Sequence, residues 1–472
     1  MENLSRRNFI RNAAAMAVGT GLLGTLTQRQ AFASQLDDYK ALVCVYFYGG
    51  LDSSDTLIPY DQESYDQLLS HRASLMDAYN VNADNSSRNR NNLLPISPIN
   101  NQDLGSLQYA FPSDLSGMKG LFDSQEMAVL GSVGTLVEPT TRAQFETKSV
   151  RVPPRLFSHN DQQSTWLSLN PEGANIGWGG RILDATVNKH PELDPRFMAL
   201  NLSRTSLYVT GEQTRSFKIS SNGSARVSAL KTPHIIGSSQ NYNVARERLS
   251  AFLQRKNSAS SNVFVRDLTQ LQGNGISNGA LFDEQYDMAP DLVTNFPNTQ
   301  LADQLEAVAN TIAIRDNIGA KRQIFFVGIP GFDTHANQAI AMPGLHKHIN
   351  DAVMAFRNAM VELNAWDKVT LFTASDFGRT LTSNSTGTDH GWGAHHFIMG
   401  GGVKGGRIYG SMPNLDTSSN SYTDRRGRLI PTVSVEQYAS TLGSWFGLDQ
   451  TELQSTLPNL ANFNEKDLGF FI

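Results

Sequence analysis

The sequence has a single cysteine, no strong excess of positive or negative charge, and no long apolar run. Its 472 residues include a single cysteine, Cys44, which excludes an internal disulfide and any metal site built from several thiolates. The 39 basic residues are outnumbered by 44 acidic ones, and a net charge of −5 predicts no nucleic-acid partner. The 38 glycines follow no G-X-Y repeat, which excludes a collagen.

The first 33 residues have the layout of an export signal. Paired arginines, Arg6 and Arg7, precede a moderately apolar stretch over 13–26, and Ala31-Phe32-Ala33 is a small-x-small cleavage site. The apolar stretch is shorter than the roughly 20 residues that span a bilayer, which favours a cleaved signal over an anchor. We predict export by the twin-arginine translocase, a periplasmic or secreted product, and no stable membrane span after cleavage.

Removal of this segment changes the charge of the chain. It carries four arginines and one glutamate, so cleavage takes the net charge from −5 to −8. The twin-arginine route carries proteins that fold before export, and a chain that folds in a reducing cytoplasm gains nothing from disulfide partners. That route also allows a metal ion to be loaded before export.

The chain after the signal predicts an α/β fold. The run over residues 41–48 is apolar, β-branched and aromatic, as in a parallel strand that is covered on both faces. Apolar residues at helical spacing over 345–366 lie between two such strands, so those strands should be parallel. We predict a doubly wound, mostly parallel sheet. The other predicted strands lie at 127–130, 323–327, 369–373, 397–399 and 407–409, and a last helix lies at 435–446.

One stretch differs from the rest in composition. Residues from about 190 to 300 are rich in Ser, Asn and Thr, and Asn222-Gly223 is typical of a hairpin turn. We interpret residues 34–472 as a single domain in which this stretch forms a polar, β-containing insertion or cap.

Residues that could carry chemistry gather just after the predicted strands. Three segments, 49–56, 331–335 and 375–379, follow strands directly, and the segments 157–162 and 389–396 are equally dense in Asp and His. The carboxyl ends of parallel strands share one edge of a sheet, so these segments can converge. Mixed Asp and His ligands suit zinc, manganese or a similar divalent ion, and one or two ions would serve a displacement reaction.

Each of these residues also has an ordinary structural interpretation. Asp52 follows a strand and can equally cap a helix or form a turn. Ser158 could be a nucleophile, but neighbours in sequence such as Ser158 and His159 seldom adopt the Ser–His geometry, and no nucleophile elbow is present. His346 and His348 are expected to face solvent or to cap a helix. The functional interpretation therefore depends on the whole set.

These segments resemble, in order and spacing, the bacterial family DUF1501 from about residue 41 to 446. That family is similar to the alkaline-phosphatase-like superfamily of phosphatases, phosphodiesterases, sulfatases and phosphomutases, which hold one or two metal ions with Asp and His on a doubly wound sheet. The segments that carry the resemblance are Gly49-Gly50-Leu51-Asp52, Ser158-His159-Asn160-Asp161, Gly177-Trp178-Gly179-Gly180-Arg181, Phe332-Asp333-Thr334-His335, Ser375-Asp376-Phe377-Gly378-Arg379, Gly387-Thr388-Asp389-His390-Gly391 and Gly401-Gly402-Val403-Lys404-Gly405-Gly406.

The resemblance implies a site and an activity. Ser158 would be the nucleophile, with His159 beside it and Arg379 on the anionic group of the substrate. The implied activity is that of an exported metal-dependent hydrolase acting on a small phosphate or sulfate ester; the alternative is a secreted, non-catalytic binding or structural protein on the same scaffold. A formylglycine sulfatase is excluded because no Cys-x-Pro-x-Arg segment exists. The implied metal ligands are Asp52, Asp333, His335, Asp376, Asp389, His390 and His395.

Overall fold

The computed structural model describes residues 38–82, 87–225, 244, 247–252, 262–417, 423–424 and 426–472. The chain divides into two compact units, and the unit described here runs from Tyr39 to Ile472. The predicted export signal at 1–33 lies outside the described residues. Among the helices of the described ranges, none combines the length and the apolar character needed to cross a membrane.

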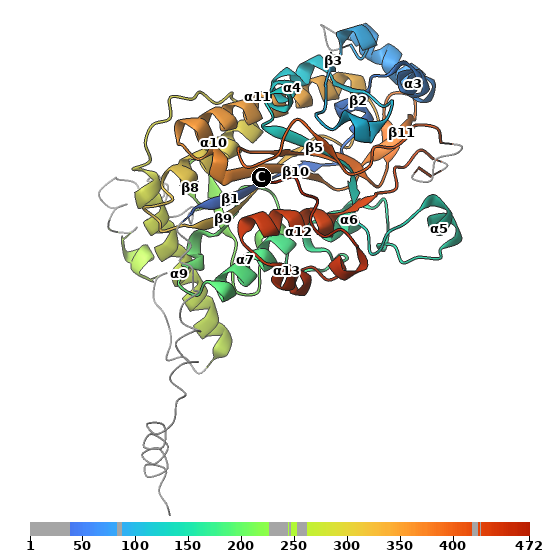
Figure 1. Cartoon of the computed structure of the whole chain (residues 1–472). Coiled ribbons are helices and arrows are strands. Elements are labelled where there is room, and N and C mark those ends of the chain that lie inside the picture. Colours follow the sequence, from blue (N-terminus) through green and yellow to red (C-terminus); the bar gives the residue numbers. More distant parts are fainter. Residues whose placement is uncertain are drawn as a thin grey trace, which may run out of the picture. The chain divides into compact units, whose positions relative to one another are not determined.

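A ten-stranded sheet runs through this unit in the order β14-β5-β13-β10-β1-β9-β6-β7-β8, and β15 pairs with β5 (Figure 1). β1 lies between β9 and β10 and is parallel to both, while β13 is antiparallel to β5 and β10. The sheet is therefore mostly parallel, as predicted. Its strands are β1 (Lys40–Tyr48), β5 (Met127–Gly134), β6 (Ala199–Asn201), β7 (Phe217–Ser220), β8 (Gly223–Ser224), β9 (Arg322–Pro330), β10 (Val369–Ser375), β13 (Ala394–Met399), β14 (Ile408–Tyr409) and β15 (Val433–Ser434).

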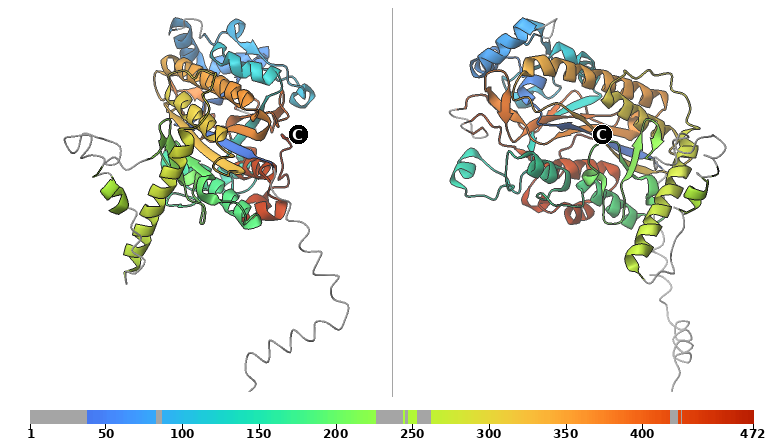
Figure 2. Two further views of the ribbon diagram at one scale, coloured as in Figure 1. Left: turned by 90° about the vertical axis from the view of Figure 1, so that its left-hand side faces the viewer. Right: turned by 180° about the vertical axis from the view of Figure 1, so that it is seen from behind.

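Helices cover both faces of the sheet, as Figures 1 and 2 show. One face packs against α3 (Gln62–Asn82), α4 (Ser116–Asp123), α10 (Gln300–Ala313) and α11 (Gln338–Glu362). The other face packs against α6 (His159–Ser168), α7 (Trp178–Lys189), α12 (Val435–Phe446) and α13 (Gln450–Thr456).

The central position of β1 in the sheet explains why the sequence of this strand is apolar without alternation. Its odd-numbered residues from Ala41 to Phe47 belong to one buried cluster, and its even-numbered residues from Leu42 to Tyr48 belong to the other. Both faces of the strand are thus removed from water, so neither set can be polar.

Further elements lie around the edges of the sheet. Their bounds are α2 (Ser53–Thr56), β2 (Ile58–Pro59), β3 (Leu94–Pro95), β4 (Tyr109–Phe111), α5 (Arg142–Thr147), α9 (Val263–Tyr286), β11 (Arg379–Ser383) and β12 (Thr388–His390). β11 and β12 form an antiparallel pair, which carries several candidate site residues.

Three features differ from the sequence expectation. Helix α11 begins at Gln338, seven residues before the predicted start, and it accommodates Pro343 near its beginning. β6, β7 and β8 belong to the central sheet although they lie within the stretch interpreted as an insertion. His346, which is expected to face solvent or to cap a helix, is fully buried, with its ring between Arg88 and Thr56.

Candidate metal centre

The turns after β1 and β9 are packed directly against each other. Gly49 has a φ of +120°, and a Cβ at this position would lie 2.2 Å from the backbone nitrogen of Asp333. Only glycine satisfies both the conformation and the close approach. The Gly-Gly turn therefore brings the segment after β9 to the end of β1, at the edge where β10 also ends.

Three side chains from distant segments meet at this edge. His159, Asp333 and His390 offer ligand atoms that all lie within 4.8 Å of one another. The Nε2 atom of His159 lies 3.5 Å from Oδ2 of Asp333, and Nε2 of His390 lies 3.3 Å from Oδ1. His335 joins them, because its Nε2 atom lies 3.2 Å from Oδ1 of Asp333 and 2.8 Å from Nε2 of His390.

The opposite nitrogens of two of these rings are held by acceptors. Nδ1 of His390 lies 2.8 Å from the backbone oxygen of Phe157, which can only accept, so this nitrogen carries the proton. Nδ1 of His335 lies 3.2 Å from Oδ1 of Asp389. A hydrogen bond from Asn384 is the main cause that lowers the pKa of Asp389, which makes it an ionised acceptor. Both rings thus turn their Nε2 atoms toward Asp333.

The third ring is held in the same way. Nδ1 of His159 donates to Oδ2 of Asp376 over 2.7 Å, and this hydrogen bond is the main cause that raises the pKa of His159. Oδ2 of Asp376, which is fully buried, also accepts from the Gly49 amide and from Nε2 of Gln163. Asp376 therefore orients His159 and contacts its Nδ1 atom rather than the Nε2 atom that faces Asp333.

Arg379 holds the carboxylate at the centre of the cluster. Its Nη1 atom donates to Oδ1 of Asp333 over 2.8 Å and also to the backbone oxygen of Gly49. Burial acts to raise the pKa of Asp333, but the hydrogen bond and charge of Arg379 outweigh it and lower that pKa. The guanidinium is wholly buried and its remaining donors go to Thr388. The expected contact of Arg379 with a substrate anion is therefore not supported by this geometry.

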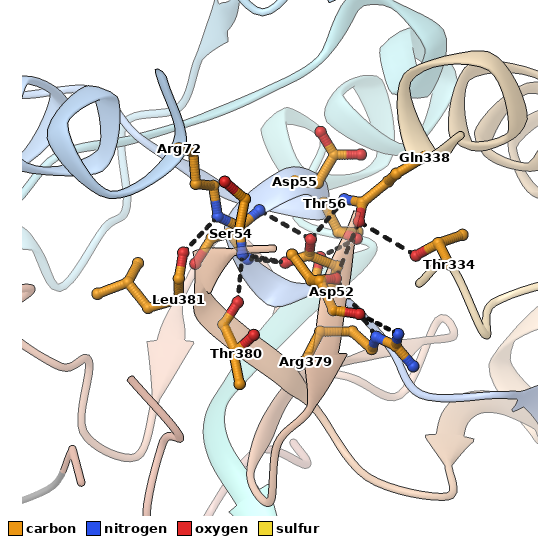
Figure 3. A network of polar contacts seen from close by, with 12 residues as sticks. Asp52, Ser54, Asp55, Thr56, Arg72, Thr334, Gln338, Arg379, Thr380 and Leu381 are labelled. Carbon is orange, nitrogen blue, oxygen red and sulfur yellow. Dashed lines mark hydrogen bonds and ion pairs between the residues drawn. The ribbon is translucent and has the colours of Figure 1, made fainter. Parts of the chain in front are cut away.

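Asp52 occupies a different environment from the one that the resemblance implies. Its carboxylate is 1% exposed and accepts from Nη1 and Nη2 of Arg72 over 2.7 and 2.9 Å, from the Ser54 amide and from Nε2 of Gln338 (Figure 3). It caps the N-terminus of α2, which is the structural alternative that the sequence left open. Four donors use its four lone-pair sites, so a metal role for Asp52 is not supported.

The other expected residues lie at or beside the cluster in different roles. His395 is buried, and its Nδ1 atom accepts from the Ser132 amide rather than facing Asp333. Burial lowers the pKa of His395 to about 4. Ser158 precedes α6 as its N-cap residue and donates from Oγ to Oδ2 of Asp161 over 2.9 Å. His395 is thus separated from the proposed ligand group, whereas Ser158 is the immediate neighbour of His159.

The structure adds residues that the sequence analysis missed. Arg428 donates to the backbone oxygen of His390 over 3.0 Å and stacks on the ring of Phe157, with its guanidinium carbon 3.8 Å from the ring centroid. Phe157 has a φ of 74°, which is unusual for a bulky residue and is often found at functional sites. Nothing in the local sequence marks these contacts, because each joins segments that are more than 30 residues apart.

The donor set matches a known class of metal site. Zinc is held tetrahedrally by imidazole nitrogens and carboxylate oxygens. Histidines that bind a metal donate their other ring N–H to a carboxylate or a backbone carbonyl, and all three rings here meet that condition. The residues that fit an ion are His159, Asp333 and His390, with His335 beside Asp333 and His390 as a candidate fourth ligand. Asp376, Asp389 and the Phe157 carbonyl lie behind the rings.

Comparison with known proteins gives a family and several distant folds. The model of the family DUF1501, described as a protein of unknown function, matches residues 39–457. No curated protein matches the sequence. Solved structures with some similarity include Ps i-CgsB in complex with k-i-k-neocarrahexaose (10% identity, 91% of this chain and 77% of that one, TM-score 0.37). Another is the PsFucS1 sulfatase from Pseudoalteromonas sp. (10% identity, 82% of this chain and 67% of that one, TM-score 0.29). A third is the phosphonate monoester hydrolase SpPMH from Silicibacter pomeroyi (10% identity, 71% of this chain and 69% of that one, TM-score 0.27).

Proposed function

This chain belongs to the DUF1501 family, and from its own side chains we propose that it is an exported metal-dependent hydrolase of a phosphate or sulfate ester. TM-scores below 0.5 do not carry a function, so the proposal depends on the metal centre. Its main support is that three imidazoles, each anchored at Nδ1, direct Nε2 toward one carboxylate. Export is supported by the twin arginines and the cleavage site of the sequence.

The cluster fits one divalent ion, with zinc favoured by its nitrogen-rich donors. A second ion would need further carboxylates, and the two that follow β1 are already paired. Asp52 is bound by Arg72, and Asp55 accepts from Nε of Arg88 over 2.8 Å in a fully buried pair. The manganese and two-ion alternatives are therefore less well supported than a single zinc ion.

A bound ion would supply a Lewis acid that polarises an ester oxygen and lowers the pKa of a nearby water. Ser158 is the candidate nucleophile, because it adjoins His159 and its Oγ atom donates to the Asp161 carboxylate over 2.9 Å. Attack by Oγ on phosphorus or sulfur would pass its proton to Asp161 and form a seryl ester, while the bond to the leaving oxygen breaks and the alkoxide takes up a proton from water. A water molecule would then hydrolyse the seryl ester, which releases phosphate or sulfate and restores Ser158. Arg379 would contribute by holding Asp333 ionised and in place, not by touching the substrate.

Elemental analysis and turnover of aryl phosphate and aryl sulfate test this proposal. We expect about one ion per chain, and we expect His390→Gln and Asp333→Asn to lower turnover by about 100-fold or more. His348→Gln is the matched control, because this histidine is exposed and belongs to the same chain but not to the cluster. Absence of a bound ion, together with thermal stability unchanged by a chelator, would refute the metal centre and the activity with it.

A non-catalytic binding protein is the second candidate, and one observation favours it. Arg379, the cation expected to hold a substrate anion, is wholly buried and engaged with Asp333, Gly49 and Thr388. An ion that binds tightly without turnover of either ester would support this candidate over the hydrolase.

A further inference from the structure

A buried chain of hydrogen bonds connects Asp52 to the metal centre. Nε2 of Gln338 donates to Oδ2 of Asp52 over 2.6 Å, and Oε1 of Gln338 accepts from Oγ1 of Thr388 over 2.9 Å. Oγ1 of Thr388 in turn accepts from Nε of Arg379 over 3.3 Å, and its backbone oxygen accepts from Nη2 of the same guanidinium. Nη1 of Arg379 then donates to Asp333 over 2.8 Å.

The direction of every bond in this chain is determined by its first member. The carboxylate of Asp52 can only accept, so the amide nitrogen of Gln338 must face it and the amide oxygen must face the other way. That oxygen accepts from the hydroxyl of Thr388. It also accepts from the hydroxyl of Thr334 over 3.1 Å (Figure 3). Because the Thr388 hydroxyl donates its hydrogen to Gln338, its oxygen lone pairs remain available to accept from Arg379.

The chain is inaccessible to water, which makes its bonds hard to replace. Gln338 and Thr388 are fully buried, and the Arg379 side chain has no exposed surface. A buried N–H group that loses its acceptor is destabilised by the full free energy of its desolvation. Without the Thr388 hydroxyl, the Arg379 guanidinium would therefore have to move to find another acceptor.

Asp333 depends on this guanidinium for its orientation. Its side chain is 47% exposed, and its other contacts are the three histidine rings of the cluster. With Arg379 displaced, the carboxylate could rotate toward water and away from the Nε2 atoms. The stability of the centre is therefore linked to residues that do not touch it.

We propose that Gln338 is a positioning residue of the metal centre, which acts through Thr388 and Arg379 to hold the Asp333 carboxylate toward the three histidines. This inference rests on the proposed function, since it assumes that the cluster binds an ion. It assigns a role to a residue that neither contacts the ion nor belongs to the ligand types of the sequence motifs.

Cobalt binding tests the inference without any substrate. Co²⁺ is titrated into chelator-treated protein, with its dissociation constant and visible spectrum as the readouts. Gln338→Met keeps the length of the side chain without its polar atoms, and Thr388→Val keeps the shape without the hydroxyl. Loss of support behind a ligand typically weakens metal binding 10–100-fold, so we expect about 10-fold weaker binding and a changed spectrum in both variants.

Two control variants separate positioning from folding. Thr388→Ser restores the hydroxyl and should return the affinity to within about twofold of the wild type. Thr370→Val removes another fully buried hydroxyl, one that has no hydrogen-bond partner among the described residues, and should leave the affinity and spectrum unchanged. Circular dichroism at the titration temperature establishes that all five proteins are folded.

The outcomes distinguish the two proposals. Wild-type protein that binds no cobalt would overturn both the metal centre and the positioning role. Wild-type binding that Gln338→Met and Thr388→Val leave unaltered would overturn the positioning role alone. Weaker binding by these two variants, with rescue by Thr388→Ser, would support the inference.

Discussion

Replacement of Asp52 by Asn should destabilise the protein strongly, while ion binding should weaken no more than in Gln338→Met, by about 10-fold. The carboxylate and the Arg72 guanidinium are 1% and 2% exposed and share two hydrogen bonds of 2.7 and 2.9 Å. In the variant, the new amide NH₂ would face donors of Arg72 or of Gln338, whichever way it is turned. The guanidinium of Arg72 would keep its charge, since arginine does not lose its proton in proteins. It would therefore remain buried after the Asp52 carboxylate that neutralises it had been removed.

The size of the loss follows from that buried charge. Removal of one partner from a buried ion pair costs about 3–5 kcal/mol, most of which is the penalty for the charge left behind. Removal of both charges should cost less than the sum of the single losses. We expect the double variant Asp52→Leu/Arg72→Met to show a coupling of about 0.5–3 kcal/mol relative to the two single variants.

Urea unfolding followed by tryptophan fluorescence measures the loss, and elemental analysis measures the ion. Lys347→Met is the control, since it breaks an exposed ion pair with Asp351 and should move the midpoint far less. An Asp52→Asn variant with unchanged stability that binds no ion even at saturating metal would refute the reasoning and return Asp52 to the metal ligands.

Three further predictions concern other parts of the molecule. The thiol of Cys44, which is 1% exposed with its pKa raised by burial, should react with a thiol reagent only after unfolding; labelling of the native chain would contradict its position in the strand. Burial lowers the pKa of His346 to about 4, below the value of about 6.5 in an unfolded chain, so the unfolded state binds the extra proton first. Stability should therefore fall by up to about 1.4 kcal/mol per pH unit as the pH drops from 6.5 to 4, and His346→Gln should reduce that slope in acid titrations of the unfolding midpoint. Asp376→Asn should weaken ion binding by about 10-fold or more, because His159 loses its charged hydrogen-bond partner; unchanged affinity in a metal titration would contradict that role.

The local pattern of the sequence was sufficient to predict the fold class and several of its central elements. The apolar run at 41–48 became the central strand β1, and the helix predicted at 435–446 became α12 with the same bounds. Both predictions follow from the apolar residues of the segment itself, and the strand shows no alternation because it is covered on both faces and has no polar side. The predicted start of α11 was seven residues too late, since the helix begins at Gln338 and contains Pro343.

The candidate site was foreseen only as a set of segments. Their place after parallel strands predicts that they meet, and His335, His390 and Asp333 do meet at that edge. Their individual roles could not be read in the same way. Asp52 and Asp333 are similar carboxylates after neighbouring strands, yet one is enclosed by Arg72 and the other faces three imidazoles.

That difference is a matter of tertiary structure. The sequence by itself determined the α/β architecture, the predicted export signal and the segments rich in Asp and His, because composition and periodicity are local properties. Only the folded chain decided which nitrogen of each ring is anchored, since the partners of His159 and His390 lie 217 and 233 residues away. The role of each polar side chain depends on the partner that packing brings to it. Gln338 is connected to the site only because packing places it between Asp52 and Thr388.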